Sequence, residues 1–295
     1  HTLGQMKNQI AQDESQRASQ ARIDGEERIT RFANRMIAAT PAEEDQLVRL
    51  YNADPAKIAI IPPGVDLCHF RPQPRTEMRR QLGLPLEQKI ALFVGRIEPL
   101  KGIDTIIQAT RLLCDQNPAL ADELTVAIVG GSPWVAQLDT EMARLQAMRT
   151  ELGLERTVRF VGARQQSVLP DFYSAADVVL MPSHYESFGM VGLEAMSCGA
   201  PVIAANVGGL AHLVKDGKTG CLVPPRAPGA LAERMNLLLS DELLRWGMGK
   251  AARKEARRYG WRIIADRMLA LYTTTAAPFS AENSALLDDC MACPG

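Results

Sequence analysis

The sequence predicts an α/β fold whose main sheet is parallel and covered by helices on both faces. Apolar strand-like runs alternate with helical segments between residues 89 and 205. The expected strands, among them 89–94, 124–129 and 178–181, are nearly continuous in apolar residues, as strands buried on both faces are. The third observation is Pro62-Pro63-Gly64, which cannot continue a sheet and separates a short N-terminal part from a longer C-terminal part.

The N-terminal part, residues 1–64, is expected to contain few elements. Residues 1–20 are polar and are expected to form a loop, followed by a helix over 21–33 and a strand over 36–40. Thr40, Pro41 and Glu43 occupy the N-cap, N1 and N3 positions of a helix that runs to about residue 51. A second strand covers 57–61. Two strands are too few for a Rossmann-like domain, so we expect residues 1–64 to belong to a truncated one.

The C-terminal part is expected to be a complete domain over residues 65–258. Its helices are expected at 75–82, 103–114, 135–152, 168–175, 190–198, 229–239 and 240–258, and its strands at 89–94, 124–129, 158–161, 178–181 and 202–205. A last amphipathic helix falls within 259–275. Residues 276–295 show no periodicity and are expected to be a flexible tail.

Composition excludes several functional classes. With 295 residues, 46% hydrophobic content and a net charge of −1, the chain can bury a core and shows no feature of a nucleic-acid partner. No apolar run reaches the length of a membrane span, no signal peptide is visible, and peripheral membrane contact stays open. The six cysteines are scattered, and the Cys290/Cys293 pair has no second pair to complete a metal site. We therefore expect a cytoplasmic protein with reduced thiols.

The stretch from Glu186 to Glu194 is the strongest candidate for a site. Glu186 lies in a loop after the strand 178–181, and Glu194 lies in the following helix among apolar neighbours, where an unpaired carboxylate is costly. The N–H groups of Gly189, Met190 and Val191 at the helix start form an anion site. Together these groups suit a sugar nucleotide, with phosphate on the amides and ribose hydroxyls on Glu194. An exposed Glu194 on an amphipathic helix is the alternative.

Arg96 and Lys101 follow the strand 89–94 and are expected at the same sheet edge as Glu186. Two cations there could hold a diphosphate and stabilise the negative charge that develops when it leaves a sugar. Two solvated surface charges are the alternative. No Asp-x-Asp motif stands at an expected strand end, so we expect no metal and no cofactor.

The segment Glu186-Ser-Phe-Gly-Met-Val-Gly-Leu-Glu194 resembles the E-x7-E motif of retaining GT-B glycosyltransferases of family 4 (GT4). Residues 195–203, residues 208–225 and the Gly-Arg-x4-Lys-Gly pattern at 95–102 are similar to that family as well. The resemblance covers about residues 1–275. It implies a GT-B fold with a complete C-terminal donor-binding domain and a truncated N-terminal acceptor-side domain, of which residues 1–64 are the second half. It also implies a final helix, 259–275, that returns to the N-terminal domain. It also implies that Glu186 faces the donor sugar, with Ser187 and Phe188 in the donor site.

The start of the chain resembles one subgroup of this family, the mycothiol-type and sucrose-phosphate-type glycosyltransferases. His1-Thr2 matches a His-Thr pair in which the His lies near the donor sugar and the Thr contacts the acceptor's phosphate. Arg22 stands at the spacing of an acceptor-phosphate arginine. Arg164, after the strand 158–161, is a candidate to border the base. An ordinary surface charge is the alternative for both arginines.

The resemblance implies a retaining glycosyltransferase that uses a nucleotide-diphospho-sugar, with UDP expected. The acceptor is expected to be small and hydroxylated, such as a sugar phosphate or an inositol phosphate. A double-displacement mechanism needs a second carboxylate about 5 Å away, and none is evident, so front-side departure fits better. The chief alternative is a catalytically incomplete module that binds a nucleotide-sugar without turnover, because half of the acceptor domain is expected to be missing. A GT-B epimerase or phosphorylase fits less well. Epimerases share the fold but not the combined Gly-Arg-x4-Lys-Gly and E-x7-E pattern, and the pyridoxal-binding lysine context that a phosphorylase needs is not found.

Overall fold

The computed structural model describes residues 2–11, 14, 17–131 and 140–275. His1, the beginning of the helix expected over 135–152, and the expected tail 276–295 with Cys290 and Cys293 lie outside the described residues.

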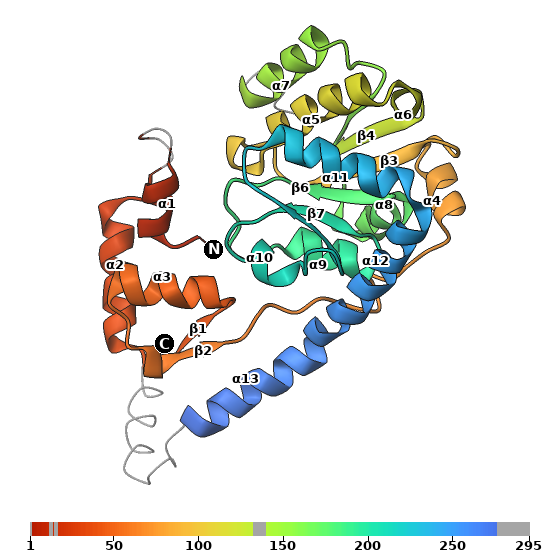
Figure 1. The fold of residues 1–295 in the computed structure, drawn as a ribbon. Helices are drawn as coiled ribbons and strands as arrows, with labels where there is room; N and C mark the ends of the chain where they lie inside the picture. Colours follow the sequence, from red (N-terminus) through yellow and green to blue (C-terminus); the bar gives the residue numbers. More distant parts are fainter. Residues whose placement is uncertain (1, 12–13, 15–16, 132–139, 276–295) are drawn as a thin grey trace, which may run out of the picture.

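The N-terminal part contains a small parallel sheet with three helices packed beside it (Figure 1). The sheet pairs β1 (Met36–Ala38) with β2 (Ile58–Ile60), and the helices are α1 (Gly4–Ile10), α2 (Gln20–Phe32) and α3 (Pro41–Tyr51). The expected start of α3 is confirmed, because the Thr40 hydroxyl accepts from the Glu43 N–H at 3.2 Å.

Helix α1 lies where the sequence predicted a loop, and long-range contacts explain the difference. The Gly4 N–H donates to Oε2 of Glu26 at 2.8 Å, and the Gln5 N–H donates to the Tyr51 hydroxyl at 2.9 Å. These partners belong to α2 and α3, so they satisfy the first N–H groups of α1 in place of a local cap. The polar composition of residues 1–20 contains no trace of them.

The C-terminal part is a six-stranded parallel sheet in the order β5-β4-β3-β6-β7-β8. This is the doubly wound arrangement, in which the strand order reverses between the first strand, β3, and the fourth, β6. The carboxyl ends of β3 and β6 therefore mark the edge where ligands bind in such sheets. The strands are β3 (Lys89–Val94), β4 (Leu124–Val129), β5 (Val158–Gly162), β6 (Val178–Met181), β7 (Val202–Ala205) and β8 (Gly220–Val223).

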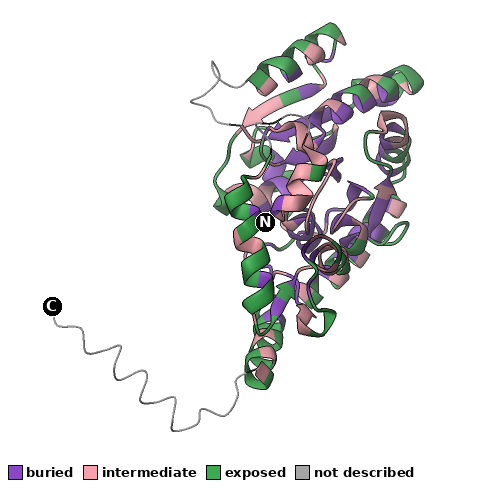
Figure 2. Ribbon diagram, turned by 90° about the vertical axis from the view of Figure 1, so that its left-hand side faces the viewer, coloured by how far each residue is buried: buried purple, intermediate pink, exposed green. Residues whose placement is uncertain are grey.

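Helices cover both faces of this sheet, and the core divides accordingly (Figures 1 and 2). Successive residues of β3 point to opposite faces: Phe93 packs in the cluster that includes α5 and α11, and Leu92 in the cluster that includes α8, α9 and α12. The helices are α4 (Arg75–Gln81), α5 (Ile103–Gln116), α6 (Pro118–Asp122), α7 (Thr140–Glu151), α8 (Leu169–Ala175), α9 (Met190–Ser197), α10 (Leu210–Leu213), α11 (Pro228–Ser240), α12 (Glu242–Ala256) and α13 (Trp261–Thr275). This arrangement confirms the predicted α/β class with parallel sheets.

The chain passes between the two parts twice, and the two passages lie side by side. Outbound, the Val65 N–H donates to the Tyr259 carbonyl at 2.8 Å; on the return, the Trp261 N–H donates to the Val65 carbonyl at 3.3 Å. Helix α13 then runs back beside the N-terminal part, where a guanidinium nitrogen of Arg267 donates to the Ile60 carbonyl at 2.5 Å (Figure 1). None of the described helices combines the length and the apolar character needed to cross a membrane.

Candidate active site

Two loops that follow neighbouring strands bring Lys101 and Glu186 together. Lys101 ends a 3-10 turn (Pro99–Lys101) after β3, and Glu186 lies in the loop after β6. Nζ of Lys101 is 2.6 Å from Oε2 of Glu186, and the two side chains are 21% and 18% exposed. The structure therefore places one residue from each of the two predicted motifs in direct contact at the strand-order reversal.

Glycines allow these loops to approach so closely. Gly102 has φ +68°, and a Cβ there would lie 2.3 Å from the Pro182 carbonyl oxygen. Behind Glu186, the Gly209 N–H donates to the Glu186 carbonyl at 2.8 Å, and a Cβ on Gly208 would lie 2.1 Å from that same oxygen. Gly208 and Gly209 thus fix the backbone that presents Glu186.

A cavity of about 660 Å³ opens between Glu186 and the N-terminal part. Among the described residues, the N–H groups of Gly189, Met190 and Val191 at the start of α9 have no hydrogen-bond partner, so they remain available to an anion. Near this cavity the Tyr185 hydroxyl donates to Oε1 of Gln46 in α3 at 3.0 Å. The predicted donor residues in its lining are Lys101, Glu186, Ser187, Phe188, Gly189, Met190 and Val191, and the opposite walls include Ala39, Glu43, Trp261 and Ile264.

Glu194 is buried, with 6% of its surface exposed, so the alternative of an exposed glutamate is wrong. Its partner is Tyr173 of α8, whose hydroxyl donates to Oε2 of Glu194 at 2.8 Å. Burial raises the pKa of Glu194, and hydrogen bonds from Tyr173 and Gln166 oppose that rise. The sequence indicated that a partner was needed but not which one, because Tyr173 lies 21 residues away in another helix.

Arg96 does not share a cavity with Lys101. Its side chain is 77% exposed, and Nη1 lies 2.5 Å from Oε1 of Glu98. Arg96 lines a cavity of about 450 Å³ towards the N-terminal part and another of about 610 Å³ beside Arg164. Arg96 and Lys101 thus line different cavities, and their joint binding of a diphosphate stays a prediction.

The cavity of about 450 Å³ gathers the residues predicted for the acceptor. Thr2 and Arg22, the two residues predicted to bind the acceptor, line it together with Lys7 and Arg96, so three cations meet there. Arg22 is held from two sides: Nε lies 2.8 Å from Oε1 of Glu26, and Nη2 donates to the Thr2 carbonyl at 2.5 Å.

Glu26 anchors this corner, and sequence reasoning missed it. Burial acts to raise its pKa, but hydrogen bonds from Tyr51, Gly4 and Arg22 bring the pKa of Glu26 below the ordinary value. The ionised carboxylate therefore joins α1, α2 and α3. No local signal reveals this role, since Gly4 and Tyr51 lie 22 and 25 residues from Glu26.

Arg164 lies at the carboxyl end of β5, where Nη1 donates to the neighbouring Ala163 carbonyl at 2.9 Å. It borders the cavity of about 610 Å³, whose floor includes Gly130 and Gly131. Gly130 must be glycine, because a Cβ there would lie 1.8 Å from the Gly95 carbonyl oxygen. Within the described ranges, no three His, Cys, Asp or Glu side chains are grouped so as to hold a metal ion.

Almost the whole described chain matches models of known protein families. The family model "Glycosyl transferases group 1" matches residues 74–255, and "Glycosyltransferase Family 4" matches residues 1–68. A D-inositol 3-phosphate glycosyltransferase of Thermomonospora curvata is 39% identical over 97% of this chain and 68% of the relative. One of Kribbella flavida is 40% identical over 96% of this chain and 66% of the relative. The chain thus spans about two thirds of the length of these relatives.

Solved structures agree. Sucrose-phosphate synthase from Thermosynechococcus elongatus superposes with a TM-score of 0.82 at 36% identity, over 93% of this chain and 66% of that one. HepE of Anabaena, in complex with UDP and glucose, superposes with a TM-score of 0.77 at 27% identity, over 87% of this chain and 68% of that one. By sequence and by its GT-B structure, the chain belongs to the group 1 glycosyltransferases.

Proposed function

We propose that this chain carries out retaining glycosyl transfer from a UDP-sugar to a small hydroxylated acceptor that bears a phosphate. The observation that supports this most directly is the 2.6 Å contact between Lys101 and Glu186, beside the unpartnered N–H groups that begin α9. A cation and a helix start hold a diphosphate, and a carboxylate accepts from sugar hydroxyls. The UDP and glucose bound to HepE support the choice of donor.

Each group has a role in the proposed reaction. The donor's diphosphate binds Lys101 in place of Glu186, so the Glu186 carboxylate becomes free to bind the donor sugar. Glu194 accepts hydrogen bonds from the ribose hydroxyls. When the bond from the anomeric carbon to the phosphate oxygen breaks, Lys101 and the amides of α9 stabilise the charge on the leaving UDP. The acceptor oxygen attacks on the same face, and its proton passes to the departing diphosphate. His1, outside the described residues, is proposed to lie near the sugar.

The acceptor's phosphate is proposed to bind in the cavity of about 450 Å³ lined by Thr2, Lys7 and Arg22. Glu26 pairs with Arg22 and Glu98 with Arg96, so three lining cations face two carboxylates, and a phosphate dianion would balance the excess. The names of the curated relatives, D-inositol 3-phosphate glycosyltransferases, support a phosphorylated cyclitol as the acceptor. Arg96 lies between this cavity and the one beside Arg164, so it could contact either substrate.

Calorimetric titration with UDP, GDP and ADP tests the donor site. We expect UDP to bind, and Lys101→Ala to weaken binding by about 1.5–3 kcal/mol, the loss of a charged hydrogen bond. Arg96→Ala is titrated alongside and is expected to lose less, since Arg96 lines other cavities. Lys218→Ala, an exposed lysine in the turn before β8, is the matched control and should bind as the parent does. Equal UDP affinity in the parent and in Lys101→Ala would refute the proposed donor site.

Turnover is tested separately with UDP-glucose and inositol 3-phosphate, with product configuration followed by NMR. Arg22→Ala should raise KM for the phosphorylated acceptor about tenfold and leave UDP binding unchanged. A metal-independent reaction should run at the same rate in EDTA. Binding of UDP without turnover would support the alternative of a nucleotide-sugar-binding module.

A further inference from the structure

Another cavity, lined in part by cationic side chains, lies at the edge of the main sheet opposite the candidate active site. It has a volume of about 390 Å³ and forms between α8, the end of α9 and α12. Its wall includes Ala176 and Pro201, which stand at the amino-terminal ends of β6 and β7, whereas Glu186 follows the carboxyl end of β6. The cavity is therefore separated from the proposed donor and acceptor sites by the full length of the strands.

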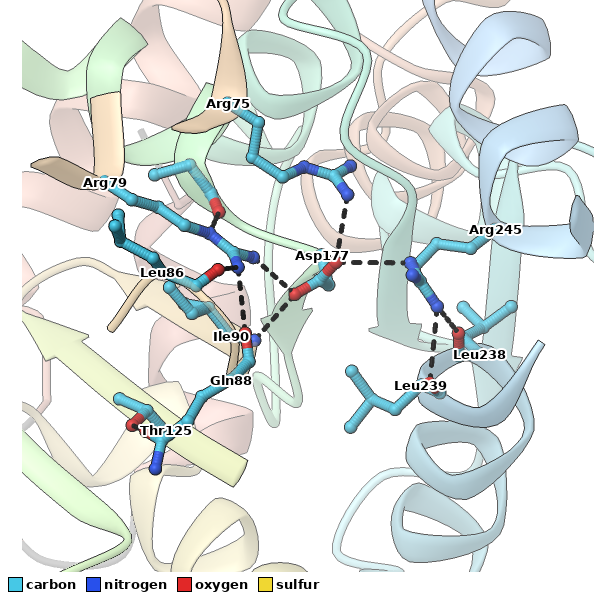
Figure 3. A network of polar contacts seen from close by, with 11 residues as sticks. Arg75, Arg79, Leu86, Gln88, Ile90, Thr125, Asp177, Leu238, Leu239 and Arg245 are labelled. Carbon is cyan, nitrogen blue, oxygen red and sulfur yellow. Dashed lines mark hydrogen bonds and ion pairs between the residues drawn. The ribbon is translucent and has the colours of Figure 1, made fainter. Parts of the chain in front are cut away.

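Positive charge is in excess beneath this cavity. Asp177 is 2% exposed, and its carboxylate forms ion pairs with three arginines. The same carboxylate accepts a hydrogen bond from the Ile90 N–H at 2.7 Å. Figure 3 shows Arg75, Arg79 and Arg245 reaching Asp177 from different sides, at 3.1, 2.7 and 3.3 Å. Three guanidinium groups thus share one carboxylate. Burial lowers the pKa of Arg79, and repulsion from Arg75 and Arg245 adds to that effect.

Two further cations line the same cavity from α12. Lys250 and Arg253 have no carboxylate partner among the residues that the structure describes. The Lys250 ammonium instead lies over the ring of Trp246, 4.2 Å from its centroid, and Trp246 also lines the cavity. Arg75, whose side chain is 44% exposed, completes the rim. Clustered cations repel one another, and an anion with several oxygens relieves that repulsion.

We propose that this cavity binds the phosphate group of a small phosphorylated metabolite, held by Arg75, Lys250 and Arg253. Arginine forks and a lysine ammonium are the usual partners of phosphate, and three of them converge here. Trp246 offers an apolar surface to the rest of the ligand, since aromatic faces pack on sugar rings and similar groups. On binding, Lys250 leaves the Trp246 ring for the phosphate. The site is independent of the proposed glycosyl transfer.

Calorimetry with inorganic phosphate and with glucose 6-phosphate, at constant ionic strength, tests the proposal. The background is Arg22→Ala/Arg96→Ala, which disables the proposed acceptor cavity, and saturating UDP fills the proposed donor site. We expect one binding event that is weakened about tenfold or more by Lys250→Ala and by Arg253→Ala. Lys254→Ala is the matched control, because Lys254 is exposed on the same helix and does not line the cavity. Tighter binding of glucose 6-phosphate than of phosphate would assign a role to the Trp246 surface.

Intrinsic fluorescence locates the event. Phosphate should change the emission of the protein saturably, and Trp246→Phe should abolish that change. Absence of binding in the background protein, or binding that survives in Lys250→Ala/Arg253→Ala, would overturn the proposal. So would an equal response to chloride, because it would reflect screening of surface charge.

Discussion

Glu194 is a carboxylate that the fold accepts at a cost. It is buried against Tyr173, and desolvation raises its pKa above the ordinary value of 4.5. The folded chain therefore holds this proton more tightly than the unfolded chain does. Glu194 favours folding below about pH 4.5, and this contribution is lost as the pH rises through the folded pKa. Once ionised, the carboxylate disfavours folding and can accept from a ligand hydroxyl.

Glu194→Gln should therefore stabilise the chain and weaken its proposed ligand binding. The amide oxygen can still accept from Tyr173, while the buried charge is gone. We expect Tm to rise by about 2–4 °C at pH 7, the equivalent of about 1 kcal/mol, and UDP affinity to fall about tenfold. Thermal melts from pH 5 to pH 8 check the sign, since the gap between the two proteins should widen with pH. A gap independent of pH would contradict this account.

Residue types in the site could be predicted from the sequence, but their pairings could not. Gly-Arg-x4-Lys-Gly and the two glutamates indicated a diphosphate site, yet nothing local indicated that Lys101 would contact Glu186 while Arg96 turned to Glu98. The pairing of Tyr173 with Glu194 could not be predicted for the same reason. Tertiary packing decides whether a loop side chain pairs with a near or a distant residue, and no fixed spacing in the sequence indicates which pair will form.

At the scale of elements, the loop that bears Glu186 depends on the glycines behind it. A Cβ on Gly209 would lie 2.3 Å from the Cα of Phe188 and 2.4 Å from the Ser187 carbonyl oxygen, so the loop must move. Gly209→Ala should lower UDP affinity about tenfold or more with little loss of the main sheet, as calorimetry and circular dichroism would show. Gly229→Ala, where an added Cβ meets nothing within 4 Å, is the control. Unchanged UDP affinity in Gly209→Ala would refute the role given to this loop.

The docking of α13 depends on another glycine. A Cβ on Gly64 would lie 2.5 Å from the Trp261 ring, so Gly64→Ala should push the start of α13 away and speed hydrogen exchange along that helix. Gly25→Ala serves as the contrast: it lies inside α2 with nothing within 4 Å, and should stabilise the chain by about 0.5–1 kcal/mol. Hydrogen-exchange rates in α13 equal to those of the parent protein would show that the Trp261 ring moves aside without destabilising the helix.

The continuous apolar strands of the main sheet were predicted well, and several of the shortest elements outside them were not. Strands β3, β4, β6 and β7 have the predicted bounds, because continuous apolar runs between turn residues leave little choice. Helix α1, helix α10 and strand β8 were missed. Helix α10 has four residues, too few to show a helical period, and α1 owes its first hydrogen bonds to Glu26 and Tyr51.

For the molecule as a whole, Asp177 joins segments that are far apart in the sequence. It links α4, β3 and α12 at the start of β6 (Figure 3). Asp177→Asn removes the counter-charge of buried arginines. It should lower the free energy of unfolding by about 3–5 kcal/mol, as measured by urea denaturation. Asp115→Asn, at an exposed pair within α5, should change it by at most about 0.5 kcal/mol. Similar losses in both variants would contradict the role of the buried network.

The paired passages at Val65 and Gly260 have a mechanical consequence. Both covalent links between the parts cross at one point, where two backbone hydrogen bonds join them. Such a point acts as a hinge: it resists translation of one part against the other and permits rotation. The loops after β3 and β6 lie beyond the hinge, so a small rotation there becomes a larger displacement across the cavity beside Glu186. The width of that cavity is thus governed by torsion in a few linker residues rather than by the two sheets themselves.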